Sequence, residues 1–347
     1  MAEHWESTVR RANLIMGFER LGSPTDLTKQ VESFSYTDNL DGEADSLEVT
    51  LEDFEGRWKW DWYPVEGDKV YGHLLCQNWD RLGNLPLIDF GVLTIDDVEP
   101  SGPPDKVTVR AVSTPITSTL KKQPRSRLFE GLTLKKIFQQ IAGEQGLGLD
   151  WKTTGFQDKP RDIVAQNKES PWAFLTRLAK ENGLTVKVAE QKLIVQYGVS
   201  LEQQDPILTI KLGEARLLRY RFHSSALNVY KACQVLYHDP VDNQTHTHTF
   251  EPQNPPKVGP ILKISERVAS KDEAKKLAQA KLREKNLQQH PGSLVFEGNP
   301  SLKAGEILTV EGHGKHDDNY LITRATHRLS GSSAYETEVS IKRKVGF

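Results

Sequence analysis

Two pairs of histidines in this 347-residue sequence have a spacing that could place them on a metal ion. His246 and His248 alternate along an expected strand, so both imidazoles face the same side and could bind zinc or copper. His313 and His316 are followed directly by two aspartates in an H-x-x-H-D-D segment. Neither segment supplies four ligands by itself, and polar segments of this kind more commonly form exposed turns and strand edges. We therefore assign no metal site.

Carboxylates gather in the loop from Tyr36 to Asp45, which could in principle bind calcium. An EF-hand would need glycine at the sixth position and glutamate at the twelfth, and this loop does not have that register. The pair Asp41-Gly42 is typical of a turn, so we predict a solvated loop. Its four acidic side chains are Asp38, Asp41, Glu43 and Asp45.

A second carboxylate pair, Asp96 and Asp97, has the residue types of a glycosidase. Adjacent side chains on a strand face opposite ways, so we expect these two not to converge on one bond. The sequence contains no G-x-S-x-G, no H-E-x-x-H and no P-loop motif. We therefore predict no catalytic residues, no cofactor and no enzymatic activity.

Three tryptophans alternate in the segment 58–62, and we predict a strand that carries all three indoles on one face. Such a face could stack on carbohydrate, which would suit a glycan-active or cell-wall-active protein. It could equally pack against a core or a neighbouring subunit, and we favour packing because large rings dominate cores and interfaces. The three residues are Trp58, Trp60 and Trp62.

The overall composition excludes several classes of protein. Hydrophobic residues make up 37% and charged residues 27%, and no apolar run approaches the roughly 18 residues of a membrane span. The net charge is -2, and the lysine-rich helix expected over 271–285 also carries acidic residues, which argues against a nucleic-acid binder. The first residues lack an apolar segment, so we expect no secretory signal. This is typical of a cytoplasmic protein, and a particle assembled in the cytoplasm and released by lysis would look the same.

The two cysteines, Cys76 and Cys233, lie far apart in strand-like runs. We expect buried, reduced thiols, with a single disulfide as the alternative. Neither belongs to a C-x-x-C motif, so zinc-finger and thioredoxin chemistry are excluded.

Strand patterns dominate both ends of the chain, and helix signals occupy the middle. Thr133 and Ser170 are expected N-caps of two amphipathic helices, followed by a hairpin over 184–197. Ser270 and Glu273 form a capping box for a third helix. The expected strands at the two ends cover 12–18, 31–36, 46–52, 69–75, 90–98, 106–112, 207–212, 215–222, 229–238, 245–250, 307–310, 320–327 and 334–342.

The two β-rich ends share an order of turns and strands. Gly67-Asp68 leads into one strand, and two more follow at 90–96 and 107–111. Gly305-Glu306 likewise leads into a strand, followed by strands at 319–323 and 337–341. Loop lengths differ and the identity is slight, so this pattern by itself indicates a duplication only weakly.

Three sets of residues together resemble the phage late control protein D family, the baseplate hub proteins of contractile phage tails and related injection machines. The first set runs from Tyr36 to Asp53 and continues through Trp62-Tyr63-Pro64 to Gly67-Asp68. The second joins Leu132–Ile137 to Glu169–Leu175 and Leu178–Leu184. The third joins 298–305 to 320–322 and Thr326-His327. They occur in family order over nearly the whole chain.

This resemblance implies a mainly β fold in which two tube-type antiparallel β-barrel domains flank a small helical α+β module. The expected domains are residues 1–118, 119–204 and 205–347, the last with an added helix. The expected assembly is a homotrimer that adapts a six-fold tail tube to a three-fold spike and lines the channel.

The resemblance also implies partners and a location. The expected partners are a tail-spike protein, a tail tube or tube-initiator protein and other baseplate proteins, with DNA only in passage and no stable membrane insertion. Some relatives continue into a fused spike, and because this sequence ends at Phe347 we expect a separate spike protein. The expected location is the virion tail baseplate, assembled in the host bacterial cytoplasm.

Overall fold

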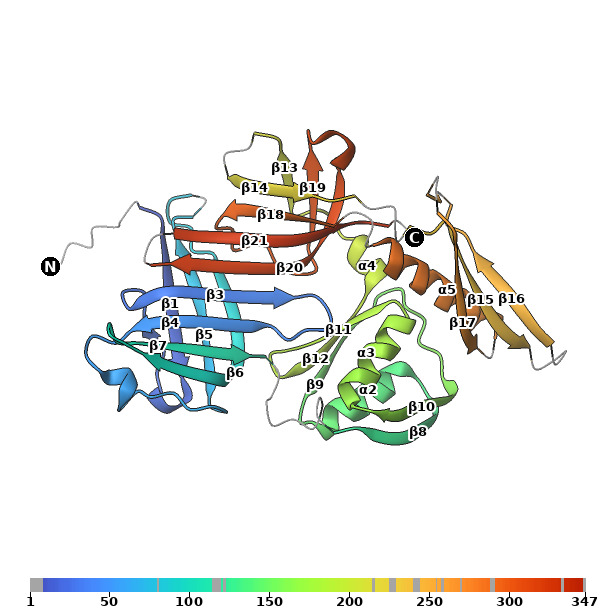
Figure 1. Cartoon of the computed structure of the whole chain (residues 1–347), viewed down its shortest axis with the longest axis horizontal. Coiled ribbons are helices and arrows are strands. Elements are labelled where there is room, and N and C mark those ends of the chain that lie inside the picture. The colour runs from blue at the N-terminus through green and yellow to red at the C-terminus, as the bar shows by residue number, and fades with distance from the viewer. Residues whose placement is uncertain are drawn as a thin grey trace.

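The computed structural model describes most of the chain, and its architecture is mainly β. Its strands form one thirteen-stranded sheet, one two-stranded sheet and two three-stranded sheets in the described part (Figure 1). The prediction of a mainly β fold with antiparallel sheets and an α+β part is confirmed. The described residues are 9–79, 81–113, 120, 123–213, 216–224, 229–239, 244–253, 255–256, 259–268, 270–287, 291–331 and 334–345.

The N-terminal unit is a curled sheet in the order β3-β4-β7-β6-β5-β1-β2, with every pair antiparallel. In β4 the alternation predicted from sequence is present, and Leu47, Val49 and Leu51 are buried in one core. The strands are β1 (Arg11–Phe18), β2 (Thr25–Asp26), β3 (Val31–Asn39), β4 (Ser46–Glu52), β5 (Lys69–Gln77), β6 (Leu87–Ser101) and β7 (Lys106–Val112).

A compact α+β module follows. Both predicted helix caps are confirmed, since the Thr133 hydroxyl accepts the Lys136 N–H and the Ser170 hydroxyl accepts the Ala173 N–H. The two helices bury their apolar faces in a shared core. The elements are β8 (Arg125–Leu132), α2 (Leu134–Glu144), β9 (Gly148–Lys152), β10 (Arg161–Glu169), α3 (Pro171–Glu181), β11 (Leu184–Ala189), β12 (Lys192–Tyr197) and α4 (Gly198–Glu202).

The C-terminal strands extend the first sheet in the order β14-β18-β21-β20, with β19 paired to both β20 and β13. In β21 the predicted apolar face is buried, because alternate residues point to one side. The strands are β13 (Leu208–Lys211), β14 (Leu217–Phe222), β18 (Pro291–Glu297), β19 (Ile307–Glu311), β20 (Asp318–Ser330) and β21 (Ala334–Arg343).

A separate layer is inserted between β14 and β18. It is the sheet β16-β15-β17, packed against α5 with its own core around Cys233, Val235 and Leu277. The predicted cap of α5 is confirmed, because the Ser270 hydroxyl accepts the Glu273 N–H. The elements are β15 (Ala232–Asp239), β16 (Gln244–Phe250), β17 (Ile261–Val268) and α5 (Lys271–Asn286).

The two β-rich ends repeat the same strand path. In the first unit the path is β3-β4-β7-β6-β5-β1, and in the second it is β14-β18-β21-β20-β19-β13. The corresponding pairs are antiparallel, except that β13 runs parallel to β19 where β1 runs antiparallel to β5. The sequence indicated a duplication only weakly. The shared strand path shows that the two ends are a structural repeat.

The repeat extends to the irregularities of the ladders. A register shift between Ile95 and Asp97 in β6 corresponds to one between Ile322 and Arg324 in β20. Another lies between Val31 and Ser33 in β3, and its counterpart lies between Leu217 and Arg219 in β14. Bulges bend a strand at a fixed place. Two matching bulges therefore align the two units residue by residue.

The two units form one sheet because β3 pairs with β20. Residues Ser33–Asn39 of β3 lie antiparallel to Arg324–Ser330 of β20. In Figure 1 the blue strands β3 and β4 therefore continue directly into the red strands β20 and β21. Alternating patterns in the sequence predicted strands at β3 and at β20. They could not indicate that these two strands pair across almost 300 residues.

Candidate functional site

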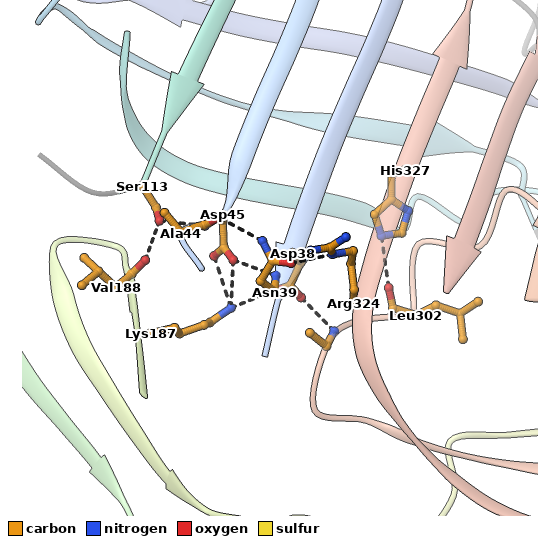
Figure 2. A network of polar contacts seen from close by, with 11 residues as sticks. Asp38, Asn39, Ala44, Asp45, Ser113, Lys187, Val188, Leu302, Arg324 and His327 are labelled. Carbon is orange, nitrogen blue, oxygen red and sulfur yellow. Dashed lines mark hydrogen bonds and ion pairs between the residues drawn. The ribbon is translucent and has the colours of Figure 1, made fainter. Parts of the chain in front are cut away.

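A buried polar network lies where the N-terminal unit, the α+β module and the C-terminal unit meet (Figure 2). Its centre is Lys187 of β11, whose Nζ lies 2.6 Å from Asp38 Oδ1 and 3.2 Å from Asp45 Oδ2. The three side chains are 14%, 12% and 3% exposed, respectively. One ammonium group is therefore paired with two carboxylates that are largely shielded from water.

The remaining oxygens of these carboxylates accept backbone hydrogen bonds. The N–H of Ala304, in the C-terminal unit, donates to Asp38 Oδ2 at 2.9 Å. The N–H of Asn39 donates to Asp45 Oδ1 at 2.9 Å, and the Asn39 amide accepts from Arg324 of β20. The network therefore ties three segments that lie far apart in the sequence, and each carboxylate has several donors.

Ser113, just after β7, makes a second link between the same parts. Its hydroxyl accepts the N–H of Asp45 at 3.0 Å and donates to the carbonyl of Val188, next to Lys187. Figure 2 shows this chain of contacts on the β4 and β7 side of the lysine. The hairpin β11-β12 is thereby held against the end of the first sheet where β7 stops and β4 begins.

Burial governs the electrostatics of the network. Burial raises the pKa of Asp45 to about 6, against the opposing effect of Lys187. Burial also acts to lower the pKa of Lys187, but Asp38 and Asp45 outweigh this effect and raise it. The lysine therefore stays charged, and the network holds a net negative charge when both carboxylates are ionised.

A second buried ion pair fixes the inserted layer. Arg283 of α5 lies 2.6 Å from Glu202 of α4, and its guanidinium also donates to the Gly198 carbonyl at 2.7 Å. Glu202 in turn accepts the N–H of Val345, near the C-terminus, at 3.2 Å. This pair joins α5, the α+β module and the segment that follows the last strand, β21.

His327 of β20 forms a third buried contact. Its Nε2–H donates to the Leu302 carbonyl at 3.1 Å, which leaves Nδ1 to accept from the Tyr335 hydroxyl at 2.8 Å. Burial lowers the pKa of His327 to about 4, so the ring is neutral at neutral pH. Next to it, the Trp79 indole donates to the Gly298 carbonyl and packs on Tyr335. These contacts join the loop after β5 to the C-terminal unit.

The acidic loop is therefore not the solvated loop predicted from sequence. Asp38 and Asp45 are buried and bound to Lys187, while Asp41 accepts the Val186 N–H at 2.9 Å. Glu43 pairs with Arg324. The prediction was wrong because the cation arrives from a strand about 140 residues away, which no local pattern could reveal.

The two histidine pairs make contacts with aromatic rings. His246 stacks on Tyr237 with a centroid distance of 5.4 Å, and His316 stacks on Phe222 at 4.9 Å. The carboxylate of Asp317 accepts the backbone N–H groups of Gly312 and His313. Within the described ranges no group of three or more His, Cys, Asp or Glu side chains could hold a metal ion.

Asp96 and Asp97 do not face opposite ways as predicted. Both are exposed and lie between the buried residues Ile95 and Val98, because the bulge in β6 interrupts the alternation here. Asp97 pairs with Arg110 of β7. The two carboxylates belong to an exposed acidic strand segment.

The strand predicted over the three tryptophans is also wrong. Residues Arg57–Lys59 form a 3₁₀ turn, which Asp53 stabilises by accepting the Trp58 N–H at 3.1 Å. Trp58 is 2% exposed in the core, whereas Trp60 is 80% exposed. Trp62 packs edge-on against Trp58 at 5.4 Å. The three indoles therefore form no shared binding face.

This arrangement predicts different quenching of the tryptophan fluorescence in two variants. Replacing Trp60 by phenylalanine should lower the acrylamide-accessible fraction of the emission, because an exposed indole is removed. Replacing Trp58 by phenylalanine should instead raise that fraction, because an inaccessible indole is removed from the total emission. Equal losses in the two variants, measured on the same oligomeric form, would contradict the buried position of Trp58.

The remaining predictions concern the cysteines and the membrane. Both Cys76 and Cys233 are buried thiols outside any disulfide, in agreement with the favoured interpretation. Among the described residues, no helix has both the length and the apolar character required to cross a bilayer.

Comparison with known proteins matches the chain to phage tails. A sequence model of the family described as phage tail baseplate hub (GPD) matches residues 94–333. A probable baseplate hub protein of Escherichia phage 186 is 32% identical over 166 residues, and that of Escherichia phage P2 is 33% identical over 168. These alignments cover 47% and 48% of this chain but only 39% and 41% of the relatives.

Solved structures show the same fold at low sequence identity. The tail protein from Neisseria meningitidis MC58 has a TM-score of 0.70 and 12% identity, over 95% of this chain and 96% of that one. The 43 kDa tail protein of prophage MuSo2 from Shewanella oneidensis has a TM-score of 0.69 and 14% identity, over 95% and 98%. An E. coli component of the type VI secretion system has a TM-score of 0.58 and 14% identity, over 94% and 76%.

The chain has the fold of solved phage tail proteins, in which two copies of one β unit are joined to an α+β module. The chain belongs to the phage tail baseplate hub (GPD) family. The sequence singled out Asp38 and Asp45 only as members of an acidic loop, and His327 only as part of a motif that carried the family resemblance. Nothing in the sequence indicated that these residues hold buried junctions. Lys187 lies in a predicted strand, but its position there indicates nothing about its two carboxylate partners.

Proposed function

We propose that this baseplate hub protein is a non-catalytic homotrimer that adapts the six-fold symmetry of a contractile tail tube to a three-fold spike. The observation that carries the proposal is the residue-level repeat of one β unit within the chain. Three chains with two such units each supply six similar units for a ring. The proposed domains remain 1–118, 119–204 and 205–347.

The exposed face of the continuous sheet suits the lining of a channel. It carries ion pairs such as Arg110–Glu48 on β7 and β4, and Arg328–Glu338 on β20 and β21. Within the described residues, no exposed large apolar side chain lies on β3, β4, β7, β18, β20 or β21. A polar wall of this kind would let DNA pass without binding it strongly, because both charge signs alternate.

The proposed partners are a tail-spike protein, a tail tube or tube-initiator protein and other baseplate proteins. Among structures with similar folds, one is titled a component of a type VI secretion system with likeness to phage tail proteins, and another is titled a PdpA–VgrG complex. These structural likenesses support a role in a tail or a related injection machine. The proposed location is the virion baseplate, after assembly in the host cytoplasm.

Electron microscopy of the purified protein, together with light scattering, tests this proposal. We expect a mass of three chains, and a ring with three-fold symmetry and near six-fold density at the β units. A mass of one chain over a wide concentration range, even with the spike protein added, would overturn the homotrimer.

A further inference from the structure

The inserted layer, made of β15, β16, β17 and α5, is a separate body within the chain. It lies at one end of the molecule, beyond α3 (Figure 1). All residues of its hydrophobic core come from the layer itself, between Tyr230 and Leu282. By contrast, Leu40, Leu201 and Leu321 form a core cluster that joins the first unit, the α+β module and the C-terminal unit. Among the described residues, no core cluster joins the layer to its neighbours.

The layer is connected to the C-terminal unit at one place. On the side of that unit, the backbone N–H of His223 donates to the Pro291 carbonyl at 2.9 Å, at the end of the β14–β18 pair. On the side of the layer, the Asn286 side chain accepts the Tyr230 N–H at 3.0 Å and donates to the Tyr230 carbonyl at 2.9 Å. The chain therefore enters and leaves the layer side by side, which is the arrangement of a hinge.

One buried polar contact holds the layer against the α+β module. Arg283 of α5 donates to the Gly198 carbonyl and pairs with Glu202, and the side chains of this pair are only 6% and 4% exposed. Small residues beside the pair permit the close approach of α5, because a β-carbon at Gly183 would lie 3.8 Å from that of Ala280. This contact touches α5 only in its C-terminal half.

The rest of the seam between α5 and the α+β module is loosely packed. One cavity of about 280 Å³ extends from the Arg283 contact toward Leu287, and another of about 320 Å³ extends toward Asp272. A further contact across the seam is long, since Lys276 Nζ lies 3.3 Å from the Gln157 carbonyl. Parts of a chain that meet through small polar contacts are expected to move relative to one another.

We propose that the inserted layer is a hinged arm, and that the Arg283–Glu202 pair is the latch that holds it against the α+β module. The structure shows the latched position. When the pair opens, the layer turns as one body about the connection at Tyr230 and Asn286. The two β units and the α+β module stay in place, held by their shared core and by the Lys187 network. This motion takes place within one chain and is independent of the oligomeric state.

A buried ion pair is suited to a latch because its net stabilisation is modest. Burial lowers the pKa of Arg283, and Glu202 opposes this effect. Opening the pair returns both charges to water, so the cost of burying them is recovered and both positions remain accessible. If one partner is removed, the charge that remains favours the open position, where water can solvate it.

Spin-label distances measured on the full chain test the hinge. Cysteines replace Lys136 on α2 and Thr247 on β16, which are exposed, while Cys76 and Cys233 are buried and stay unlabelled. Labelled chains are diluted into unlabelled ones, so that only distances within one chain are observed. The otherwise unchanged chain should give one narrow distance. Adding Arg283→Met should widen the distribution at least about twofold, because the released layer takes several orientations.

Two further variants and a second pair of labels serve as controls. Glu202→Ala removes the other half of the latch and should give the same widening. Lys285→Met changes an exposed neighbour on α5 and should leave the distance narrow. A label pair within the layer, Thr247→Cys with Lys275→Cys, should stay narrow in every variant, because the layer moves as one body.

Three results would overturn the proposal. A distance between Lys136 and Thr247 that stays narrow in Arg283→Met would show that the ion pair is no latch. A distribution that is already as wide without that substitution would show the same. Widening of the label pair within the layer would show that the layer unfolds instead of turning about its connection.

Discussion

Replacing Lys187 by methionine is expected to lower the free energy of unfolding by about 3–5 kcal/mol at pH 7. Methionine fills a similar length, but it leaves Asp38 and Asp45 buried without their cation. Breaking a buried ion pair is costly because the remaining charge has lost its water as well as its partner. Denaturant unfolding followed by tryptophan fluorescence measures the change. The free energy of the first unfolding transition is compared between the variant and the wild type.

A nearby lysine provides the matched control. Lys192 on β12 is exposed, and its Nζ lies 3.9 Å from Glu190. Replacing Lys192 by methionine should change the free energy of unfolding by less than about 0.5 kcal/mol, because exposed pairs are weak. A Lys187→Met variant as stable as the Lys192→Met variant would contradict the role of the network.

The effect of Lys187→Met should depend on pH. The folded pKa of Asp45, about 6, lies above its ordinary value of 3.8, so Asp45 makes the folded state less stable as pH rises from 3.8 to 6. Removing Lys187 takes away the cation that opposes this rise. The stability deficit of the variant should therefore shrink below pH 5, where the Asp45 carboxylate can take up a proton, and reach its full size near pH 7.

Neutralising both acids supplies a rescue. Combining Lys187→Met with Asp38→Asn and Asp45→Asn leaves no buried charge, although the amides keep part of the hydrogen bonding. We expect this triple variant to recover more than half of the stability lost in Lys187→Met, and to lose the pH dependence just described. A triple variant less stable than Lys187→Met would show that the lost packing, rather than the unpaired charge, dominates.

Acidification should destabilise the protein through His327 by about 3 kcal/mol between pH 6.5 and 4. The pKa of the buried ring falls from 6.5 to about 4, and each unit corresponds to about 1.4 kcal/mol. Because the unfolded chain binds this proton first, the stabilising contribution is complete above pH 6.5 and is lost as pH falls toward 4. Protonation would also place a second proton on Nδ1, against the Tyr335 hydroxyl.

His327→Gln isolates this effect. Glutamine cannot titrate, but its amide can still donate to the Leu302 carbonyl. The difference in unfolding free energy between wild type and variant should be largest at pH 7 and should shrink by about 3 kcal/mol at pH 4. Asp45 acts in the opposite direction over nearly the same range, so the difference between variants is the quantity to measure. A difference that stays constant with pH would contradict a buried, neutral His327.

Both experiments probe the same mechanical requirement. In the proposed ring, each chain must hold its two β units and its α+β module in one orientation, and the buried polar contacts lie at the boundaries between these parts. Such contacts contribute modest net stability, but their geometry is strict because each buried charge needs its partner. We therefore expect Lys187→Met to weaken assembly even at temperatures where the chain remains folded.

The sequence by itself determined many of the local elements and the family. Alternation of apolar and polar residues predicted β4 over Ser46–Glu52 with its true bounds, because one face of the strand is buried. The hydroxyls of Thr133, Ser170 and Ser270 predicted three helix starts, since they satisfy N–H groups that the helix itself leaves unpaired. These signals depend on neighbours within a few residues.

The tertiary structure decided what contacts what. It placed Lys187 on two carboxylates about 140 residues away, and it turned the predicted tryptophan strand into a 3₁₀ turn. It also joined β3 to β20, which revealed the residue-level repeat of the two units. A strand pattern specifies a period of two and a buried face, but not the partner of its edge. The choice of partner depends on the whole chain, because the loss of entropy on joining distant segments is offset only by the core that they share.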